Sequence, residues 1–440
     1  MAKRPLPIVK TRLDKIVGGG QTLGAMPDGR KLFVWGGLPG ETVNVQVTRK
    51  KSSMAEGVVT EVIEASDKRT SPKDEDSYLS TSPWQIMDYA FENQCKAELI
   101  DQAFTLHHVE LPEQTAIVHD ENEFYYRNKV EFSWYWNFDT EQIDLAFFRR
   151  GSKGKIPLEQ TSLAKPEINE SAQAIRNIIR TKSIEARDLK TLLIRADQQG
   201  NTVCQLYVRD ENFDSLNSDD AAYLIGNTSI QGIEIIFSDP RSPASRITKR
   251  LVDFGETTLH DSILGIDFRY ATESFFQVNI PIYELALTEM KQWVPKNNPV
   301  LDLYSGVGTI GLTIGGKDCT LVEINEYAVE EMRRNISRLG SSAKAVLAPS
   351  EKALEEIKSD KTIIVDPPRA GLHNDVVEKL INEMPERIIY LSCNPVTQAR
   401  DVALLLAEDN YKVVHQKGYN FFPRTPHIEH LIVLDKASTN

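Results

Sequence analysis

The most regular pattern of apolar and polar residues lies in the last third of the chain. Six stretches have the length and apolar content of strands: 300–303, 320–322, 362–365, 388–391, 412–415 and 428–434. Three amphipathic stretches are expected to form helices: 283–294, 327–339 and 397–407. This alternation predicts an α/β fold with a doubly wound, mostly parallel sheet over residues 271–440. Ligands bind such sheets beyond the carboxyl ends of the strands.

The first 66 residues have a different pattern, of short strands separated by glycine turns. Strands are expected at 11–17, 31–35, 41–49 and 56–63. Residues 1–63 carry ten Lys or Arg and five Asp or Glu, a balance of +5. The triplet Arg49-Lys50-Lys51 is expected in one loop. Short strands at these intervals predict a small β-barrel, and its basic charge favours RNA binding over a spacer with a solvated basic face.

The middle of the chain, residues 76–270, has a mixed α+β pattern. A polar stretch at 64–82 is expected to be a linker, followed by a helix over 84–109. A hairpin, a helix and a second strand pair are expected further on: 130–136 with 145–149, 172–179, and 192–195 with 203–208. Basic residues near strand ends fit either phosphate contacts or ordinary surface charge: Arg127, Lys129, Arg149, Arg150, Lys153 and Lys155.

A glycine-rich turn follows the strand at 300–303. The segment 305–311 has the pattern G-x-G-x-x-G from its second residue, and Gly306 and Gly308 let the backbone approach a ligand closely. Glu323 ends the next strand, where a carboxylate can accept both hydroxyls of a ribose. A tight turn alone explains the glycines, but the preceding strand and Glu323 favour a nucleotide site. NAD and S-adenosylmethionine both bring a ribose, so the pattern leaves the cofactor open.

Three further chemically capable residues lie at strand ends. Asp366 begins the segment Asp-Pro-Pro-Arg, Cys393 lies in Ser-Cys-Asn-Pro, and Glu429 lies between two histidines at the start of a strand. Each has an ordinary explanation: a strand stopped by prolines, a small buried thiol, and a charge at a strand entry. However, Cys393 precedes a helix N-terminus, which is expected to stabilise its thiolate. Because carboxyl ends of strands meet at one edge, these residues are expected to converge.

Composition narrows the class of protein. The chain has 440 residues and a net charge of −12, which argues against indiscriminate binding of polyanions. Its other cysteines, Cys95, Cys204 and Cys319, are expected to be structural. The sequence contains no C-x-x-C pair, so a local metal site is not expected. No apolar run approaches the ~20 residues of a membrane span, and the N-terminus lacks an apolar signal segment. A cytoplasmic protein without disulfides is expected.

The C-terminal third resembles the RNA uracil-C5 methyltransferases that use S-adenosylmethionine. The matching motifs occur in the family's order between residues 275 and 434: Phe276-Gln277-Val278-Asn279, 302–309, Val322-Glu323-Ile324-Asn325, 366–371, Ser392-Cys393-Asn394-Pro395 and His427-Ile428-Glu429. The basic barrel is similar to the TRAM module common in this family, and Tyr126-Arg127-Asn128-Lys129 resembles a segment of its central domain. The resemblance implies a Rossmann-like methyltransferase domain preceded by a TRAM-like barrel (1–66) and a central domain (76–270).

The resemblance also implies roles for single residues. Cys393 would add to C6 of uracil, Glu429 would remove the C5 proton, and Asp366 would orient the base or the cofactor. The target base would have to leave its stack to reach them. The implied contacts to S-adenosylmethionine are Gln277, Tyr304, Gly306, Gly308, Thr309, Glu323, Ser350 and Asp366.

Two positions depart from the family. Several members hold an iron–sulfur cluster through cysteines before the central domain, but Ser82-Pro83-Trp84-Gln85 stands where such a cysteine is expected. No cluster is therefore expected. Thr309 replaces the asparagine often found at its position, which weakens that implied contact.

The leading hypothesis is a monomeric enzyme that methylates a uridine of 23S rRNA, with the T-loop uridine of tRNA as the alternative. An amino-directed base methyltransferase would need an aromatic residue after the two prolines, where Arg369 stands. A non-catalytic RNA-binding protein would not need Cys393. A dehydrogenase would leave Cys393, Glu429 and the basic barrel without a role.

Overall fold

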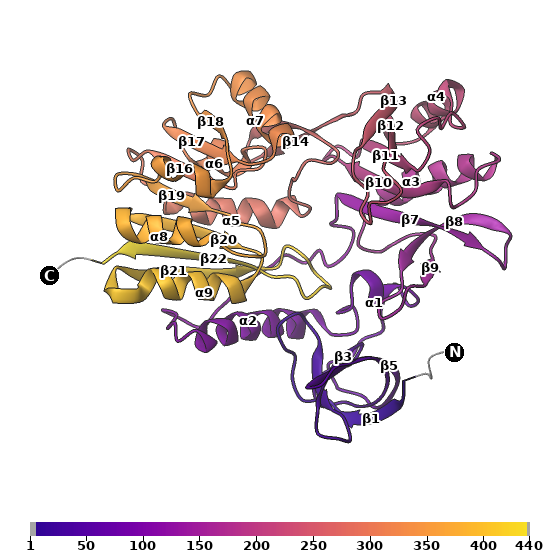
Figure 1. Cartoon of the computed structure of the whole chain (residues 1–440), viewed down its shortest axis with the longest axis horizontal. Coiled ribbons are helices and arrows are strands. Elements are labelled where there is room, and N and C mark those ends of the chain that lie inside the picture. Colours follow the sequence, from indigo (N-terminus) through magenta and orange to yellow (C-terminus); the bar gives the residue numbers. More distant parts are fainter. Residues whose placement is uncertain (1–5, 438–440) are drawn as a thin grey trace. The chain divides into compact units, whose positions relative to one another are not determined.

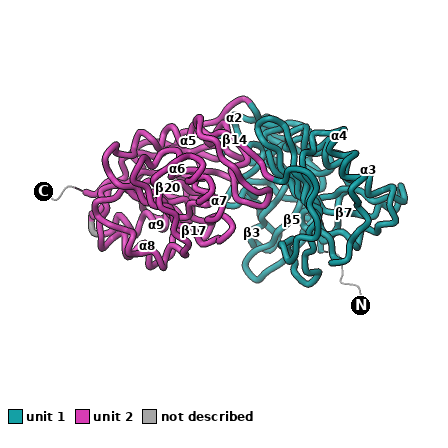
Figure 2. Tube along the Cα trace, turned by 90° about the horizontal axis from the view of Figure 1, so that it is seen from above, with its two compact units in different colours: residues 1–95, 122–257, 423–426 teal, residues 96–121, 258–422, 427–440 magenta. Residues whose placement is uncertain are grey.

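The computed structural model describes residues 6–437, which form two compact units (Figure 2). Unit 1 consists of the chain up to residue 95, residues 122–257 and residues 423–426. Unit 2 consists of residues 96–121, 258–422 and 427 onward. This division crosses the expected boundaries at 76 and 271, because residues 96–121 and 258–270 group with the C-terminal sheet.

Unit 1 begins with a five-stranded sheet of order β1-β4-β5-β3-β2 (Figure 1). Its strands are β1 (Ile8–Arg12), β2 (Thr22–Ala25), β3 (Lys31–Trp35), β4 (Thr42–Lys50) and β5 (Met54–Glu64). Alternate residues of β4, among them Val43, Val45 and Val47, are buried in its core. Just after β1 the chain bonds to β2 through Asp14 N–H to the Leu23 carbonyl at 2.8 Å, which closes the sheet into a barrel.

The expected strand at 11–17 is wrong. The chain leaves the sheet after Arg12 and turns through two glycines with positive φ, Gly19 and Gly20, before β2. Glycine adopts this conformation without steric cost, so the glycine run makes the turn that leads into β2, beyond the region expected to be a strand. The strand expected at 31–35 is confirmed, and those at 41–49 and 56–63 correspond to β4 and β5.

The stretch expected to be a linker, 64–82, is instead packed within unit 1. Arg69 donates through Nε and Nη2 to the fully buried carboxylate of Glu41, at 2.6 and 2.7 Å. Asp74 accepts hydrogen bonds from Ser162, and the short helix α1 (Tyr78–Thr81) follows. The segment has few apolar residues, and hydrogen bonds and an ion pair to buried polar groups hold it against unit 1 instead.

A seven-stranded sheet forms the rest of unit 1, in the order β13-β12-β11-β10-β7-β8-β9. Its strands are β7 (Lys129–Asn137), β8 (Gln142–Phe148), β9 (Lys155–Pro157), β10 (Leu189–Ala196), β11 (Thr202–Val208), β12 (Ile230–Phe237) and β13 (Lys249–Gly255). Helices α3 (Pro166–Arg180) and α4 (Ser218–Asn227) contribute Ile168, Ile175 and Leu224 to its core. The expected hairpin, second strand pair and helix are confirmed; β12 and β13 were not expected.

Unit 2 contains an eight-stranded sheet of order β18-β17-β16-β19-β20-β22-β21-β6 (Figure 1). Its strands are β6 (Ile117–Val118), β16 (Val300–Leu303), β17 (Cys319–Glu323), β18 (Lys344–Leu347), β19 (Thr362–Val365), β20 (Arg387–Ser392), β21 (Tyr411–Tyr419) and β22 (Glu429–Lys436). The first five strands in spatial order are parallel, and β22 is antiparallel to both β20 and β21. This Rossmann-like arrangement confirms the expected doubly wound, mostly parallel sheet.

Helices pack beside this sheet and bury its apolar residues. They are α5 (Ile280–Gln292), α6 (Thr309–Ile314), α7 (Glu326–Leu339), α8 (Asn374–Glu383) and α9 (Pro395–Leu406). A separate hairpin, β14 (Thr258–Ile263) with β15 (Ile266–Ala271), precedes α5. Helix α2 (Tyr89–Leu106) starts five residues later than expected, and its part from Lys96 onward belongs to unit 2. Among the described residues, no helix is both long and apolar enough to cross a membrane.

Candidate active site

The glycine-rich turn between β16 and α6 has the backbone geometry that its sequence predicts. Tyr304, Gly306 and Gly308 have φ values of +64°, +56° and +88°. The Ser305 hydroxyl donates to the Asp302 carbonyl at 2.6 Å and accepts from the Val322 N–H at 3.0 Å, which ties the turn to both strands. The turn is therefore fixed by contacts of its own residues.

Glu323, at the end of β17, lies against this turn. Its Oε2 accepts the Gly306 N–H at 3.0 Å and its Oε1 accepts the Asn325 N–H at 2.8 Å. The Asn325 side chain in turn caps α7 by accepting from the Tyr327 N–H at 3.0 Å. The carboxylate is half-buried and oriented by two backbone groups, so its remaining lone pairs can accept ribose hydroxyls.

Asp302 is a buried acid next to the turn that the sequence analysis did not single out. Its Oδ2 accepts the Gly311 N–H at 2.9 Å, whereas its buried Oδ1 has no hydrogen-bond partner within residues 6–437. Burial raises the pKa of Asp302 to about 8. A spare acceptor, a carboxylate at a strand tip and a glycine turn together suit a ligand with a ribose and an amino group, as S-adenosylmethionine has.

The other residues expected to contact the cofactor are spread around the same strand ends. Burial raises the pKa of Tyr304, and Ser350, a buried residue at the start of a short 3₁₀ helix, opposes this shift. Thr309 Oγ1 lies 2.9 Å from the hydroxyl of the buried Tyr283 on α5. Gln277 is buried in the segment between β15 and α5.

The register of the sheet brings Cys393 and Glu429 together. In the antiparallel pair of β20 and β22, Ser392 pairs with His430 at the end of the ladder; Cys393 follows Ser392 and Glu429 precedes His430, so both lie at this end of the pair, and the charge of Glu429 raises the pKa of the Cys393 thiol. In the parallel pair of β16 and β19, Leu303 pairs with Val365. Tyr304 and Asp366 therefore leave adjacent strands at the same edge, which is the switch point of the sheet where ligands bind.

Charge in this cluster is dominated by two acids. Burial raises the pKa of Glu429 above its usual range, and the charge of Asp366 raises it further, whereas Arg369 opposes both effects. Burial also raises the pKa of Asp366. Two neighbouring carboxyl groups do not both ionise easily, because the two negative charges repel each other. One of them therefore holds a proton more readily than an ordinary carboxyl group does.

The expectation that a helix N-terminus stabilises the Cys393 thiolate is wrong for this structure. Cys393 does precede α9, but burial raises the pKa of its thiol to about 11, and the charges of Glu429 and Asp366 act in the same direction. Only Arg369 and a backbone hydrogen bond lower it. The sequence suggested the helix end, but not the burial and the two acids from other strands that raise the pKa of this thiol.

Arg369 is a site residue that the sequence analysis missed. Its Nη2 lies 3.0 Å from Nδ1 of His427, two residues before Glu429. Its carbonyl accepts from Asn394 Nδ2 at 2.8 Å and from Thr397 Oγ1 at 3.1 Å. Arg369 thus bonds on both sides of the pair formed by Cys393 and Glu429. The sequence did contain a signal for this role, because Arg369 is a cation directly after the two prolines that follow Asp366.

Cys95, Cys204 and Cys319 are buried, and burial raises the pKa of the thiols of Cys204 and Cys319. In the part of the chain that the structure describes, no group of three or more His, Cys, Asp or Glu residues is arranged to hold a metal ion. At the position expected for a cluster cysteine, Gln85 Nε2 donates to Ser82 Oγ at 2.7 Å.

Comparisons with known proteins agree with this site. A family model described as tRNA (Uracil-5-)-methyltransferase matches residues 349–437, and one described as Methyltransferase small domain matches residues 284–389. The chain is 28% identical to an uncharacterized RNA methyltransferase of Enterococcus faecalis over 94% of each chain. It is 29% identical to one of Nanoarchaeum equitans, over 93% of this chain and 90% of that relative.

A solved structure has the same fold over almost the whole chain. It is the Pyrococcus abyssi tRNA (uracil-54, C5)-methyltransferase in complex with S-adenosyl-L-homocysteine, with a TM-score of 0.77 and 21% identity. The match covers 97% of this chain and 100% of that chain. Together with the family model and the relatives, it confirms the resemblance found in the sequence. The chain is thus similar to RNA methyltransferases over most of its length, and its C-terminal part matches the uracil-C5 family model.

Proposed function

We propose that this protein methylates C5 of one specific uridine in 23S rRNA through a covalent bond between Cys393 and C6 of the base. One observation carries the proposal: Cys393 and Glu429 lie at the same end of the pair of β20 and β22, with Asp366 close enough to shift the pKa values of both. A nucleophile next to a buried carboxylate is what addition at C6 followed by proton removal at C5 requires.

Cys393 starts the reaction. C5 of uracil is a poor nucleophile until the C5–C6 double bond is disrupted. The thiol loses its proton to water, because Cys393 keeps part of its surface exposed, and the thiolate forms a bond to C6. The electron pair of the double bond then moves toward the carbonyl oxygen on C4, which gives an enolate with a nucleophilic C5. Arg369, which lowers the pKa of the thiol, favours this step.

Glu429 completes the reaction after C5 has been methylated. Its carboxylate accepts the C5 proton, the electron pair of that C–H bond re-forms the C5–C6 double bond, and the sulfur of Cys393 leaves as thiolate. The raised pKa of Glu429 makes it a stronger base than an ordinary carboxylate. Asp366 orients the base or the cofactor beside them.

The cofactor residues are assigned by the contacts described above. Glu323 would accept the ribose hydroxyls, the turn of Gly306 and Gly308 would lie against the ligand backbone, and Asp302 Oδ1 would accept from its amino group. Gln277, Tyr304, Thr309 and Ser350 would complete the pocket. When bound, S-adenosylmethionine supplies the electrophilic methyl group and a positive sulfonium charge that opposes the effect of the two acids on the Cys393 thiol.

The proposal is tested by trapping the adduct. The protein is incubated with S-adenosylmethionine and either 23S rRNA or tRNA in which uridine is replaced by 5-fluorouridine. Fluorine at C5 leaves no proton for Glu429 to remove, so a methylated protein–RNA adduct that survives denaturation is expected with one of the two RNAs. Adduct formed with tRNA but not with 23S rRNA would move the assignment to the T-loop uridine.

The matched control is Cys393→Ala, because Cys95, Cys204 and Cys319 remain in that variant. Loss of the adduct in Cys393→Ala, with the RNA still bound, supports the assignment of the nucleophile. Adduct formation by Cys393→Ala would refute it. Methyl transfer to an exocyclic amino group by the wild-type protein would favour an amino-directed enzyme instead, and RNA binding without any methyl transfer would favour a binding protein.

A further inference from the structure

The loop between β21 and β22, residues 420–428, leads directly to Glu429 and is held by buried charged residues that the proposed mechanism does not use. Its residues 423–426 belong to unit 1, while its two ends belong to unit 2. Arg424 adopts a φ of +64°, a conformation that side chains other than glycine rarely take. A strained backbone of this kind persists only where the surroundings hold it.

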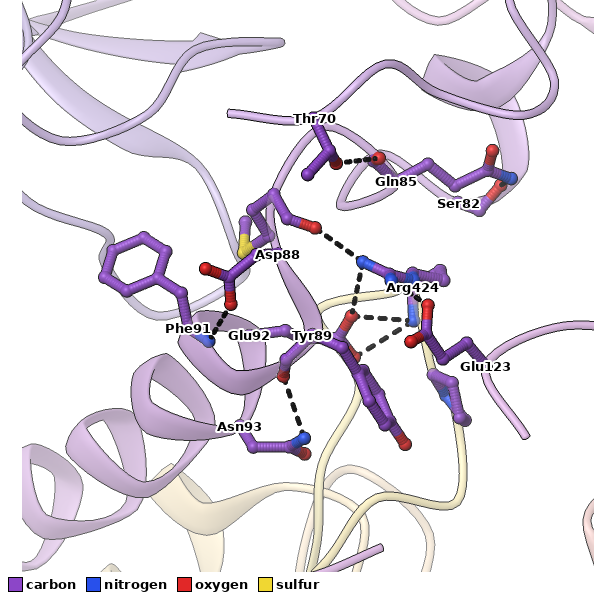
Figure 3. Close-up of polar contacts among 12 residues, drawn as sticks. Thr70, Ser82, Gln85, Asp88, Tyr89, Phe91, Glu92, Asn93, Glu123 and Arg424 are labelled. Carbon is purple, nitrogen blue, oxygen red and sulfur yellow. Dashed lines mark hydrogen bonds and ion pairs between the residues drawn. The ribbon is translucent and has the colours of Figure 1, made fainter. Parts of the chain in front are cut away.

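The surroundings of Arg424 in unit 1 are shown in Figure 3. Its backbone N–H lies 3.0 Å from both carboxylate oxygens of Glu92, which is fully buried on α2. Its guanidinium donates from Nη1 to the Met87 carbonyl at 2.5 Å and pairs through Nη2 with Glu123 (Figure 3). The ring of Tyr89 lies 5.3 Å from the guanidinium carbon. Arg424 therefore bonds through both its backbone and its side chain.

The residue before Arg424 is also held. The Pro423 carbonyl accepts from the Tyr126 hydroxyl at 2.9 Å, and the Arg424 carbonyl accepts from the Trp84 N–H at 3.2 Å. These partners are about 300 residues away in sequence. Such bonds fix the course of the loop rather than its local turn.

Within unit 2 the start of the loop is held by Lys96, one helical turn after Glu92 on α2. Lys96 has no exposed surface, and its Nζ donates to Asn420 Oδ1 at 2.6 Å and to the Phe422 carbonyl at 3.1 Å. The Asn420 N–H donates to the Val118 carbonyl at 2.9 Å. Burial of an ammonium group costs free energy unless the group is hydrogen-bonded. The two acceptors, both in residues 420–422, therefore tie Lys96 to the start of this loop.

We propose that Arg424, Glu92 and Lys96 are positioning residues for Glu429: by fixing the loop on both sides of Phe422, they place the base that removes the C5 proton. The inference rests on the proposed function, because it assigns a task to Glu429. Glu429 lies five positions after Arg424, and a displacement of about 1 Å at a reacting group can lower a rate about 100-fold. None of the three residues contacts the base or the cofactor in this proposal.

The chemistry provides a test that a merely structural role would not pass. If Glu429 is displaced while Cys393 is intact, methyl transfer still occurs but the adduct cannot collapse. Arg424→Met should therefore lower kcat about 10- to 100-fold, change KM for RNA by less than about threefold, and accumulate a methylated, denaturation-resistant adduct on ordinary RNA. Glu429→Gln should accumulate the same adduct, and the wild-type protein should not.

Matched variants keep the result interpretable. Arg424→Lys retains the charge and should recover part of kcat. Arg241→Met removes an exposed arginine of unit 1 that pairs with Asp239, so it should leave kcat and the amount of adduct unchanged. If Arg424→Met does not fold, Glu92→Gln, which weakens the same pair while keeping its size, decides the question. A fall in kcat without adduct accumulation would overturn the positioning role, as would an unchanged kcat. If Glu429→Gln itself accumulates no adduct, the proposed function fails instead.

A second, independent feature is an arginine-lined hollow in unit 2. It has a volume of about 490 Å³ and lies between β15 and α7, with Arg269, Arg333, Arg334 and Arg338 in its lining against one acid, Glu330. All four arginines are exposed, in a chain whose net charge is −12. Arg334 is neutralised by ion pairs of 2.7 and 2.6 Å with Glu330 and Glu331. Arg269, Arg333 and Arg338 leave the hollow with a positive charge.

We infer that this hollow binds phosphate groups of the substrate RNA outside the methylated nucleotide. Arg333 lies seven residues after Glu326, the first residue of α7, which corresponds to about 10 Å along the helix from its start, three residues after Glu323. Nucleotides that flank the target uridine can cover such a distance. Like the positioning role, this inference rests on the proposed function.

The salt dependence of RNA binding tests it. Arg333→Ala should weaken binding of the RNA substrate and lower the slope of log Kd against log salt concentration by about 0.7 to 0.9, the value for one lost phosphate contact, with kcat unchanged at saturating RNA. Arg241→Ala is the control, since its side chain is 90% exposed and paired with Asp239. An unchanged slope in Arg333→Ala and in Arg338→Ala would overturn the inference. Absence of methylation by the wild-type protein would count against the proposed function and not against the hollow.

Discussion

Replacement of Glu323 by glutamine gives the sharpest test of the cofactor site. A carboxylate offers about four lone-pair positions, and the N–H groups of Gly306 and Asn325 occupy two of them. The two that remain match the two ribose hydroxyls. In Glu323→Gln the side chain has one oxygen and one NH₂ group, so the NH₂ must face one of the two backbone N–H groups.

The magnitude follows from this count. The variant loses one charge-assisted hydrogen bond to the ribose, which contributes about 1.5–3 kcal/mol, and it places a donor against a donor. Because about 1.4 kcal/mol corresponds to a factor of ten, the Kd for S-adenosylhomocysteine should rise roughly 10- to 100-fold. Isothermal titration calorimetry measures that Kd directly, without the RNA or the chemical step.

Glu326→Gln is the matched control, because Glu326 is an exposed acid three residues further on, at the first position of α7. Its affinity for S-adenosylhomocysteine should remain within about twofold of the wild-type value. Equal Kd values for Glu323→Gln and wild type would refute the assignment of Glu323 as the ribose acceptor. An equal loss of affinity for S-adenosylhomocysteine in both variants would show an effect of net charge rather than of the site.

Three further predictions concern the nucleophile and the barrel. Because the thiol of Cys393 has a pKa raised to about 11 and only its thiolate attacks, the rate of adduct formation with 5-fluorouridine RNA should rise with pH between about 7 and 9; a rate that falls over this range would contradict the assignment. Arg369→Met removes the side chain that lowers this pKa, so its profile should lie at higher pH than that of the wild type, and Arg369→Lys should restore part of the difference. Arg69→Met leaves the fully buried carboxylate of Glu41 without its cation and should destabilise unit 1 by about 3–5 kcal/mol in urea unfolding; a loss as small as that of Arg241→Met would show that the pair is dispensable.

The residues of the active site were predictable because strand ends are visible in sequence. Apolar runs at 300–303, 362–365 and 388–391 each stop at a polar residue, and parallel strands bring those stops to one edge. The sequence therefore indicated that Asp366 and Cys393 would converge. It did not indicate the balance of charge there, since the shift in the thiol pKa depends on burial and on two acids from other strands.

Other features depend on contacts that leave no local pattern. The segment 64–82 looks like a linker because it is polar, yet Arg69 finds Glu41 28 residues earlier in the chain. Glu92 and Arg424 are 332 residues apart, and the sequence around either residue does not indicate that the two are in contact. Helix α8 and strands β12 and β18 were also not expected, although the apolar run of β12 and the amphipathic pattern of α8 are typical of a strand and a helix.

The path of residues 420–428 has a consequence for dividing this chain into parts. A cut near residue 257 yields a C-terminal fragment that carries the whole methyltransferase sheet except β6, with Cys393 and Glu429 included. That fragment lacks Glu92, Lys96 and Tyr126, so Arg424 and the ends of its loop lose the partners that hold them. The C-terminal sheet can therefore not be treated as a module that is independent of the N-terminal sequence: residues far upstream hold the loop that leads to Glu429.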